Sequence, residues 1–433
     1  METADYNPVD HRSPEQLATS SFAVFFHLIK AAAGSGVLFL PYAFKKTGYL
    51  AAILCSIIIG TVCIHTAVLT IRCSQILCKR SRVPALSLAQ TAEASFKHGP
   101  QVLHKFARAF GIATNILVCG VQVQTTIVYI LYVSSSFKQV VEYFTDWGQD
   151  IRIYIVVFLP FFCLLAVAPN FSFLTPFSVC GTICLVFGLL VSFGYFLSDF
   201  PSPSRLPAFT GFEQLGVFCA VFTFSVYNMS MLMPLENTMR EPHTMAVLLA
   251  AGMVINVIVY VLFGFLGFNR YEDSCDTIIK NLPLDKIPAQ IVKVVVPLSV
   301  MFTFGLQYFV LAEVVWPWLA AWIGDKVAYK IGFRIGGVVI CALFGIILPH
   351  MAPVLSLFSA VGTTTLMVLF PVVIETSTKW NEPENLKRNY MLMKNLLITI
   401  IWILTLIFGV RESILDIKHE MQATKSTEPE VCQ

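Results

Sequence analysis

The sequence predicts an all-α protein that crosses a membrane many times. Hydrophobic residues make up 56% of its 433 residues and charged residues only 13%, whereas an average soluble domain is about 25% charged. The mean hydropathy is +0.74, and long stretches contain no Asp, Glu, Lys or Arg. Two of these apolar stretches contain glycine, serine or proline near their middle, which predicts helices that are interrupted inside the membrane.

Eleven membrane spans are predicted. A spanning helix needs about 20 mostly apolar residues, because the hydrocarbon core is about 30 Å thick. Such runs lie at residues 21–44, 49–71, 109–137, 153–198 (two spans), 214–235, 243–269, 294–312, 335–374 (two spans) and 395–410. The first span is interrupted by Lys30, and the two double runs divide at Pro169 and Pro349.

The loops between the spans are short, so we expect a single transmembrane domain. It extends over residues 21–411, between a polar tail at 1–20 and a second polar tail at 412–433. Its parts are predicted as a first repeat at about 21–197, a second repeat at about 212–376, and an extra helix at about 394–411. The polar first tail does not have the basic start and apolar core of a cleavable signal peptide.

The charges in the loops predict an orientation. Loops on the side of the N-terminus carry fourteen Lys and Arg residues, and the loops on the other side carry nine. The positive-inside rule then predicts a cytosolic N-terminus. Because eleven is odd, the C-terminus is expected on the extracellular or lumenal side.

Several classes of function are disfavoured. The net charge is only +3 and there is no basic tract, so no nucleic acid partner is expected. No nucleophile–base pair, metal motif or phosphate loop is recognisable, so we do not expect an enzyme. The 12 cysteines fit no zinc or haem spacing and are interpreted as small buried hydrophobes. The bilayer and a small substrate are the partners that remain.

The first span contains the sequence Gly34-Ser35-Gly36, which is a poor helix interior. An unwound point there divides the span into two half-helices. Free N–H groups near Gly36, at the positive end of the outer half, suit a carboxylate, and carbonyls at the end of the inner half suit an ammonium group. A free amino acid has both groups.

The sixth span has polar residues at mid-depth, followed by Pro234. Spans one and six are corresponding members of two five-helix halves, and paired interruptions of this kind indicate a transporter site between inverted repeats. Close helix packing at Gly-x-Gly is the alternative interpretation. The predicted substrate-binding residues are Ala33, Gly34, Ser35, Gly36, Phe224, Ser225, Tyr227, Asn228 and Gln122.

Ionisable residues inside the spans are candidates for coupling. His27 lies about two turns before the predicted break, and an imidazole can bind and release a proton near neutral pH. A structural, hydrogen-bonded histidine is the alternative for His27, and it is the interpretation that we favour for His65. Lys30 is expected to reach the interface. Glu313 is a weaker candidate for a proton path.

Two glutamines in the third span leave two interpretations open. Gln122 and Gln124 are amides in an apolar segment, and such groups seek hydrogen-bond partners. They are expected either to line the cavity or to bond one helix to another.

Three motifs resemble the proton-coupled amino acid transporters of the amino acid/auxin permease group. Residues 27–41, from His-Leu-Ile-Lys through Gly-Ser-Gly to Leu-Pro, are similar to the family pattern HLLKGxxGTGLLxLP. Residues 234–242, which begin Pro-Leu-Glu-Asn, are similar to its PLENxMxxP segment. Residues 348–371 resemble its turn between the ninth and tenth spans.

This resemblance implies a LeuT-like fold of two inverted five-helix repeats plus an eleventh helix. It also implies symport of small neutral amino acids with a proton, in the plasma membrane or the endolysosomal membrane, with His27 as the proton-coupling histidine. No other cofactor is implied. The chain departs from the family at Ala31, and at Tyr227-Asn228-Met229-Ser230, where the family has a glutamate followed by Gly-x-Gly. A non-transporting amino acid sensor or scaffold and a sodium-coupled carrier are therefore the alternatives.

Overall fold

The computed structural model describes the chain except residues 1–5, 13–16, 18, 33, 146–147, 170, 199, 228, 381–384 and 424–433. The regular structure of the described residues is helical, which confirms the predicted class, and their single β-bridge pairs Thr19 with Met239. The α-helices are α1 (Ser21–Ala32), α2 (Leu40–Thr47), α3 (Tyr49–Ser81), α4 (Leu88–Lys97), α5 (Ala107–Phe144), α6 (Ile151–Ala166), α7 (Phe171–Leu197), α8 (Phe212–Ser225), α9 (Met229–Asn237), α10 (Met245–Arg270), α11 (Ile287–Ile323), α12 (Val327–Ile347), α13 (Met351–Phe358), α14 (Phe370–Thr378) and α15 (Asn385–Ala423).

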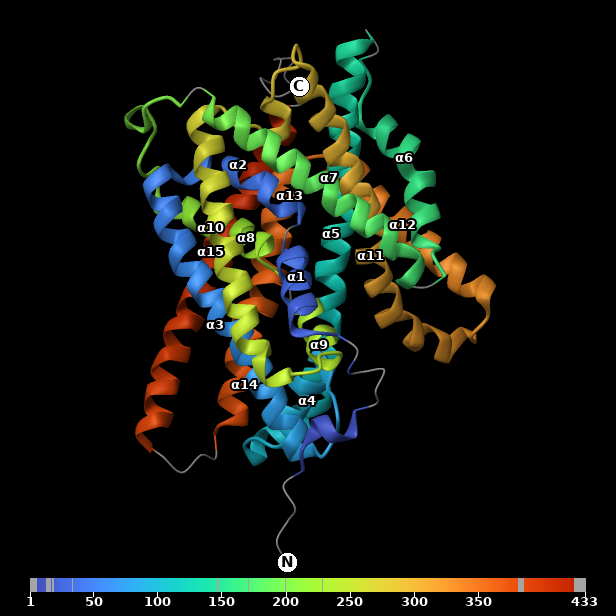
Figure 1. Cartoon of the computed structure of the whole chain (residues 1–433), viewed down its shortest axis with the longest axis vertical. Coiled ribbons are helices and arrows are strands. Elements are labelled where there is room, and N and C mark those ends of the chain that lie inside the picture. The colour runs from blue at the N-terminus through green and yellow to red at the C-terminus, as the bar shows by residue number, and fades with distance from the viewer. Residues whose placement is uncertain are drawn as a thin grey trace, which may run out of the picture.

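Most of the helices stand in one elongated bundle (Figure 1). Within the described residues, nine helical segments are long and apolar enough to cross a membrane, and α6 is a shorter apolar helix of 16 residues. The chain is therefore an integral membrane protein with many spans. The expected first span is divided between α1 and α2, so the count of eleven stays a prediction.

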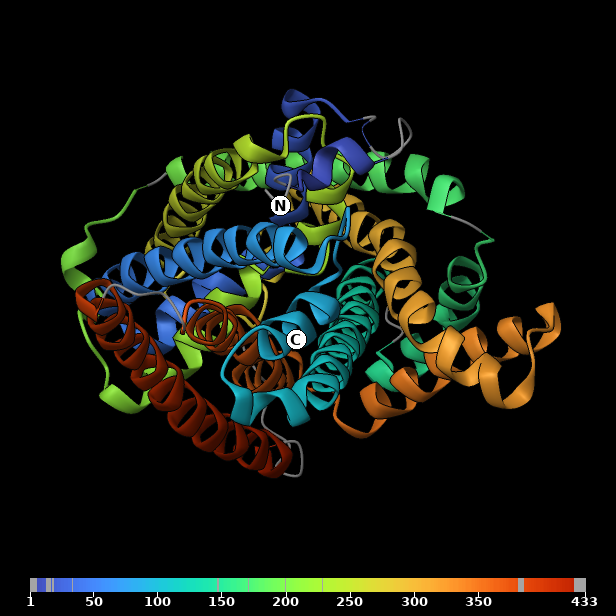
Figure 2. The ribbon, with the colours of Figure 1, turned by 90° about the horizontal axis from the view of Figure 1, so that it is seen from below.

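The two ends of the bundle carry different parts of the chain. One end, the N-terminal face, holds Arg12 beside the end of α9. At the opposite end, the far face, Lys46 of α2 forms an ion pair of 2.8 Å with Asp416 of α15. Seen from the N-terminal face, α15 runs along one edge of the bundle and α5 lies nearer its middle (Figure 2). The last helix continues to Ala423, beyond residue 411, where the sequence suggests that the last span ends.

Small residues let α2 lie very close to α10. A Cβ on Gly264 would lie 2.5 Å from the ring of Phe44, and one on Gly267 would lie 2.7 Å from Pro41. Close contact through glycine is how membrane helices gain packing energy without a hydrophobic driving force. Helix α2, the half of the first span nearer the far face, is thus packed tightly against α10.

Candidate functional site

The first span is interrupted where the Gly-Ser-Gly sequence predicts a break. Helix α1 ends at Ala32, and Gly34 has an extended backbone with φ −97° and ψ 179°. A 3-10 helix, η2 (Ser35–Phe39), follows and leads directly into α2. Because the first N–H groups of a helix have no partner within it, the start of η2 offers donors near Ser35.

The sixth span is interrupted at the same depth of the bundle. Helix α8 ends at Ser225, Val226 and Tyr227 leave the helix, and α9 begins at Met229. Both interruptions agree with the sequence prediction. Ala33 and Asn228, two of the predicted binding residues, lie outside the described residues.

The two interruptions are in direct contact. A Cβ on Gly36 would lie 2.6 Å from the Cα and 2.8 Å from the Oγ of Ser225. Real Cβ atoms do not approach a backbone atom so closely, so a residue without a side chain is required here. Gly36, which the sequence predicts as part of the unwound point, therefore also allows the two discontinuous helices to touch.

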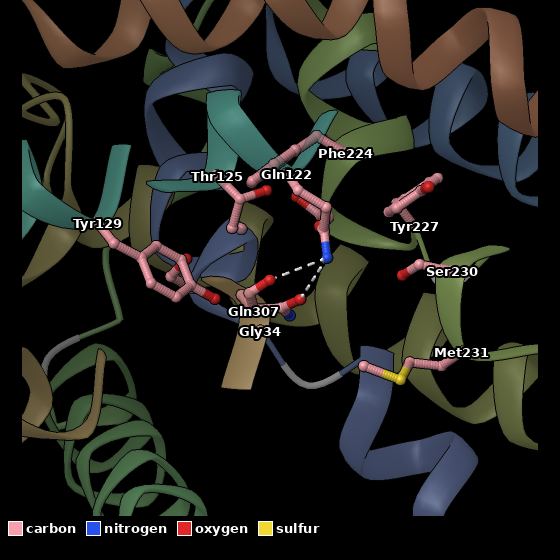
Figure 3. A pocket seen from close by; sticks show the side chains of 12 residues that line it. Gly34, Gln122, Thr125, Tyr129, Phe224, Tyr227, Ser230, Met231 and Gln307 are labelled. Carbon is pink, nitrogen blue, oxygen red and sulfur yellow. Dashed lines mark hydrogen bonds between the residues drawn. The ribbon is translucent and has the colours of Figure 1, made fainter. Parts of the chain in front are cut away.

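A small cavity of about 50 Å³ lies beside this contact (Figure 3). Seven of the predicted binding residues line it, from the two interruptions and from α5. They are Gly34, Ser35, Gly36, Phe224, Ser225, Tyr227 and Gln122. The structure brings these residues together, and their role as substrate ligands stays a prediction.

The cavity is also lined by five residues that the sequence did not predict. Thr125 and Tyr129 follow Gln122 by three and seven residues, so the three share one face of α5, and this spacing was a usable signal. Gln307 comes from α11, and Ser230 and Met231 come from α9. The polar amide of Gln307 in an uncharged span was the other signal that the sequence offered.

The polar groups of the cavity are only partly satisfied. The Nε2 of Gln122 donates to the backbone oxygen and to the Oε1 of Gln307, both at 3.3 Å (Figure 3). The hydroxyls of Ser35 and Tyr227 are buried and make no hydrogen bond with the described part of the chain. Because buried polar groups are nearly always hydrogen-bonded, these two hydroxyls favour a polar ligand in the cavity.

A second cavity, of about 280 Å³, extends from this site toward the N-terminal face. The two cavities share Gly34, Ser35, Tyr129, Met231 and Gln307. The larger one is also lined by Thr19, which precedes α1, by Leu235 of α9, and by His27, which is exposed. The predicted proton-coupling histidine thus lies in the passage that leads to the site.

A buried ion pair fastens the N-terminal segment next to this passage. The Nη2 of Arg12 lies 3.1 Å from the Oε2 of Glu236, and each side chain is 2% exposed. The guanidinium also donates to the backbone oxygens of Glu236 and Pro84, both at 2.9 Å. Five donors in a rigid fork make arginine suited to such a site, so Arg12 is held firmly against the end of α9.

The other polar residues of the spans make bonds between helices. The Nε2 of Gln124 donates to Ser359 Oγ at 2.5 Å. Of the two interpretations of Gln124, the structure therefore shows the bond between helices. Glu313 pairs with Lys330 at 2.9 Å and with Arg334 at 3.0 Å. His65 contacts Lys394 at 3.0 Å, in keeping with a structural histidine. The side chain of Lys30 lies outside the described residues.

The residues that the structure describes contain no group of three or more His, Cys, Asp or Glu side chains that could hold a metal ion. What they do contain is a pair of discontinuous helices that meet beside a small polar cavity in a membrane bundle. Discontinuous helices that meet near mid-membrane are typical of transporter sites.

The comparisons agree with that class. A family model described as "Transmembrane amino acid transporter protein" matches residues 18–415, and the chain belongs to this family of amino acid transporters. It is 31% identical over 419 residues to the "Proton-coupled amino acid transporter-like protein pathetic" of Drosophila melanogaster, covering 95% of this chain and 88% of that protein. It is 27% identical over 307 residues to "Amino acid transporter ANT1" of Arabidopsis thaliana, covering 69% of this chain and 67% of that one.

Solved structures show the same fold. The inward-facing conformation of Mhp1 superposes with a TM-score of 0.60 at 11% sequence identity, covering 98% of this chain and 96% of that one. A closed conformation of Mhp1, described as a nucleobase-cation-symport-1 family transporter with bromovinylhydantoin bound, superposes with a TM-score of 0.53 at 11% sequence identity. The match covers 99% of this chain and 98% of that one. The predicted LeuT-like fold is thereby confirmed.

Proposed function

We propose that this chain carries small neutral amino acids across a membrane, together with a proton, by alternating access. The observation that carries the proposal is the small cavity at the two interruptions, where N–H groups at the start of η2 meet the unpaired hydroxyls of Ser35 and Tyr227. A zwitterion needs donors for its carboxylate and acceptors for its ammonium group. Helix ends and hydroxyls supply both.

The size and charge of the cavity support a small and neutral substrate. A water molecule needs about 10–15 Å³ of such space, so a volume of about 50 Å³ corresponds to a few waters. That is comparable to the backbone of an amino acid with a short side chain. None of the residues that line this cavity is charged, so the site offers no counter-ion to a charged side chain.

The proton is proposed to act through His27. Its side chain lines the passage between the site and the N-terminal face, and its imidazole is the group there whose ordinary pKa lies near neutral pH. Protonation in that passage places a positive charge close to the route that the substrate takes. In this proposal, proton and substrate share the passage and leave through the same face.

The orientation is proposed from two features. The loops of the N-terminal face carry more Lys and Arg, which favours the cytosolic side. Cys275, in the loop between α10 and α11 that begins at the far face, is disulfide-bonded, and disulfides persist in oxidising compartments. The far face is accordingly proposed to be extracellular or lumenal, in the plasma membrane or an endolysosomal membrane.

A proteoliposome experiment tests the proposal. Purified protein in liposomes is offered each of the amino acids, with and without an acidic exterior, and with sodium or choline as the bath cation. Accumulation of glycine, alanine or proline driven by the pH gradient is expected, with no need for sodium. In a His27→Gln variant uptake should no longer depend on pH.

The other outcomes separate the alternatives. Uptake that requires sodium would replace the proton with sodium as the coupling ion. Binding of an amino acid without movement under any gradient would favour a sensor. Uptake in His27→Gln with an unchanged pH profile would refute the role of this histidine.

A further inference from the structure

A third hollow, the far-face hollow, lies at the far end of the bundle. Its volume is about 400 Å³, and it is bordered by α2, the loop between α10 and α11, the start of α13 and the end of α15. Tyr42 and Lys45 line it from α2, His350 lines it from just before α13, and Glu420 lines it from α15. Among the described residues, it shares no lining residue with the two cavities of the substrate site. The hollow is therefore separate from the passage to the N-terminal face.

The outer half of the first span seals the substrate site from this hollow. The seal consists of the four residues from Val37 to Leu40, which lead from the small cavity into α2, and each of their side chains is at most 1% exposed. In this structure the site is thus open toward the N-terminal face and closed toward the far face. Alternating access, the proposed function on which this inference rests, requires the seal to open when α2 moves.

Helix α2 is tied to the last helix at the far face. The Nζ of Lys46 lies 2.8 Å from the Oδ1 of Asp416, and the two side chains are 29% and 15% exposed. Asp416 lies beyond residue 410, where the last uncharged stretch ends, in a part of α15 that covers residues 411–423. This end of α15 therefore reaches the first span outside the apolar region of the bundle.

The same end of α15 also holds the start of α13. The Oε2 of Glu420 lies 2.8 Å from the Nδ1 of His350, the residue directly before α13. Glu420 follows Asp416 by four residues, and residues four apart lie on one face of a helix. One face of α15 thus joins α2 to α13, the two helices that border the far-face hollow.

The contact of α2 with α15 differs in kind from its contact with α10. Gly264 and Gly267 leave no room for a methyl group between α2 and α10, and so close a fit favours movement of these two helices as one unit. The ion pair with α15 is made by two partly exposed side chains, which water can solvate when they separate. Such pairs contribute little to stability, so this contact can break and form again in each transport cycle.

We propose that the end of α15 is a clamp on the far face, and that the ion pair of Lys46 with Asp416 stabilises the state in which this face is closed. Opening of the far side separates α2 from α15 and breaks the pair. Loss of either charge then shifts the population toward the state that is open to the far face. The expected shift is about two- to fivefold, the ratio to which about 0.5–1 kcal/mol for a partly exposed ion pair corresponds.

The test measures how often the seal opens. The full chain in nanodiscs carries Val37→Cys or, as a second probe, Leu38→Cys, and the reaction of this cysteine with a membrane-impermeant thiol reagent is followed by mass spectrometry. Because both side chains are buried in the closed state, labelling requires opening. Asp416→Asn and Lys46→Gln should each raise the labelling rate about two- to fivefold. Exchange of the charges, Lys46→Asp with Asp416→Lys, should lower the rate again.

Two controls separate the clamp from a general loss of stability. Glu142→Gln removes a carboxylate that pairs with Lys138 at 3.7 Å within α5, near the end of that helix at the far face, and it should leave the labelling rate unchanged. The native thiol of Cys63, which is free and buried in α3, reports a general loosening of the bundle in the same molecules. Its labelling should not rise with that of the seal.

Three results would overturn the proposal. The first is unchanged labelling of both probes in Asp416→Asn. The second is an equal rise at Cys63, which would show that the whole bundle is loosened. The third is labelling in the charge exchange that is as fast as in the single variants. Labelling needs no substrate or gradient, so if the seal opens as expected but no variant takes up an amino acid, the clamp holds and the transport proposal fails.

Discussion

The Cα of Ser225 lies 2.6 Å from the position that a Cβ on Gly36 would occupy. The two residues belong to different interrupted helices and are separated by 189 residues (225 − 36) of sequence. Their contact joins the start of η2 to the end of α8. The cavity beside it is lined by both residues, so its shape depends on this approach.

Replacement of Gly36 by alanine should therefore damage both stability and transport. The added methyl group would have to push the backbone of Ser225 away, and such overpacking costs about 1–3 kcal/mol. Thermal unfolding of the purified protein and amino acid uptake measure the two effects. Gly120→Ala is the control, because a Cβ on Gly120 meets nothing within 4 Å. Equal melting temperatures of the two variants would contradict the contact.

Gln122 and Gln307 should act as a coupled pair. Each single change to leucine leaves part of a buried amide without its partner, whereas the double change removes both. A double-mutant cycle on the binding of the transported amino acid should give a coupling free energy of about 0.5–1.5 kcal/mol. If the two single effects simply add, the amides act independently and the prediction is wrong.

Tyr227 should limit the size of the substrate. Its side chain lines the cavity (Figure 3), so Tyr227→Ala enlarges the space and should raise the ratio of leucine uptake to alanine uptake. Tyr227→Phe removes only the hydroxyl and keeps the ring, so this ratio should stay close to that of the unaltered protein. A ratio that is equal in all three proteins would show that Tyr227 does not set the size limit.

Loss of Arg12 should release the N-terminal segment. In Arg12→Ala the carboxylate of Glu236 stays buried without its cation, which typically costs about 3 kcal/mol or more, although Gln75 still donates to it at 3.4 Å. Arg12→Lys keeps the charge but not all the hydrogen bonds of the fork, so an intermediate loss is expected. Melting temperature and proteolysis of the N-terminal segment measure the effect. Unchanged proteolysis in Arg12→Ala would show that the ion pair does not hold the segment.

The interruptions were predictable because their causes are local. Gly34 and Gly36 disfavour a helix whatever surrounds them, and the polar residues of the sixth span stand out in an apolar segment. The fold class followed from composition and the length of the apolar runs. These signals require no knowledge of which helices are neighbours.

The rest of the site was not predictable because its causes lie in tertiary packing. Nothing in the uncharged span around Gln307 indicates that its amide meets Gln122 across 185 residues of sequence. The pairing of Arg12 with Glu236, 224 residues apart, is equally invisible. Likewise, the sequence does not decide between the two interpretations of Gln124. Its bond to Ser359 depends on how α5 packs against α13 and the π-helical segment (Ser359–Thr363) that follows.

A structure of the protein with the amino acid that proteoliposomes accumulate is the most direct measurement of the central claim. We expect ligand density in the small cavity, with the carboxylate at the start of η2 near Ser35 and the side chain toward Tyr227. Density elsewhere in the bundle, with this cavity unfilled in a preparation that transports the amino acid, would contradict the account.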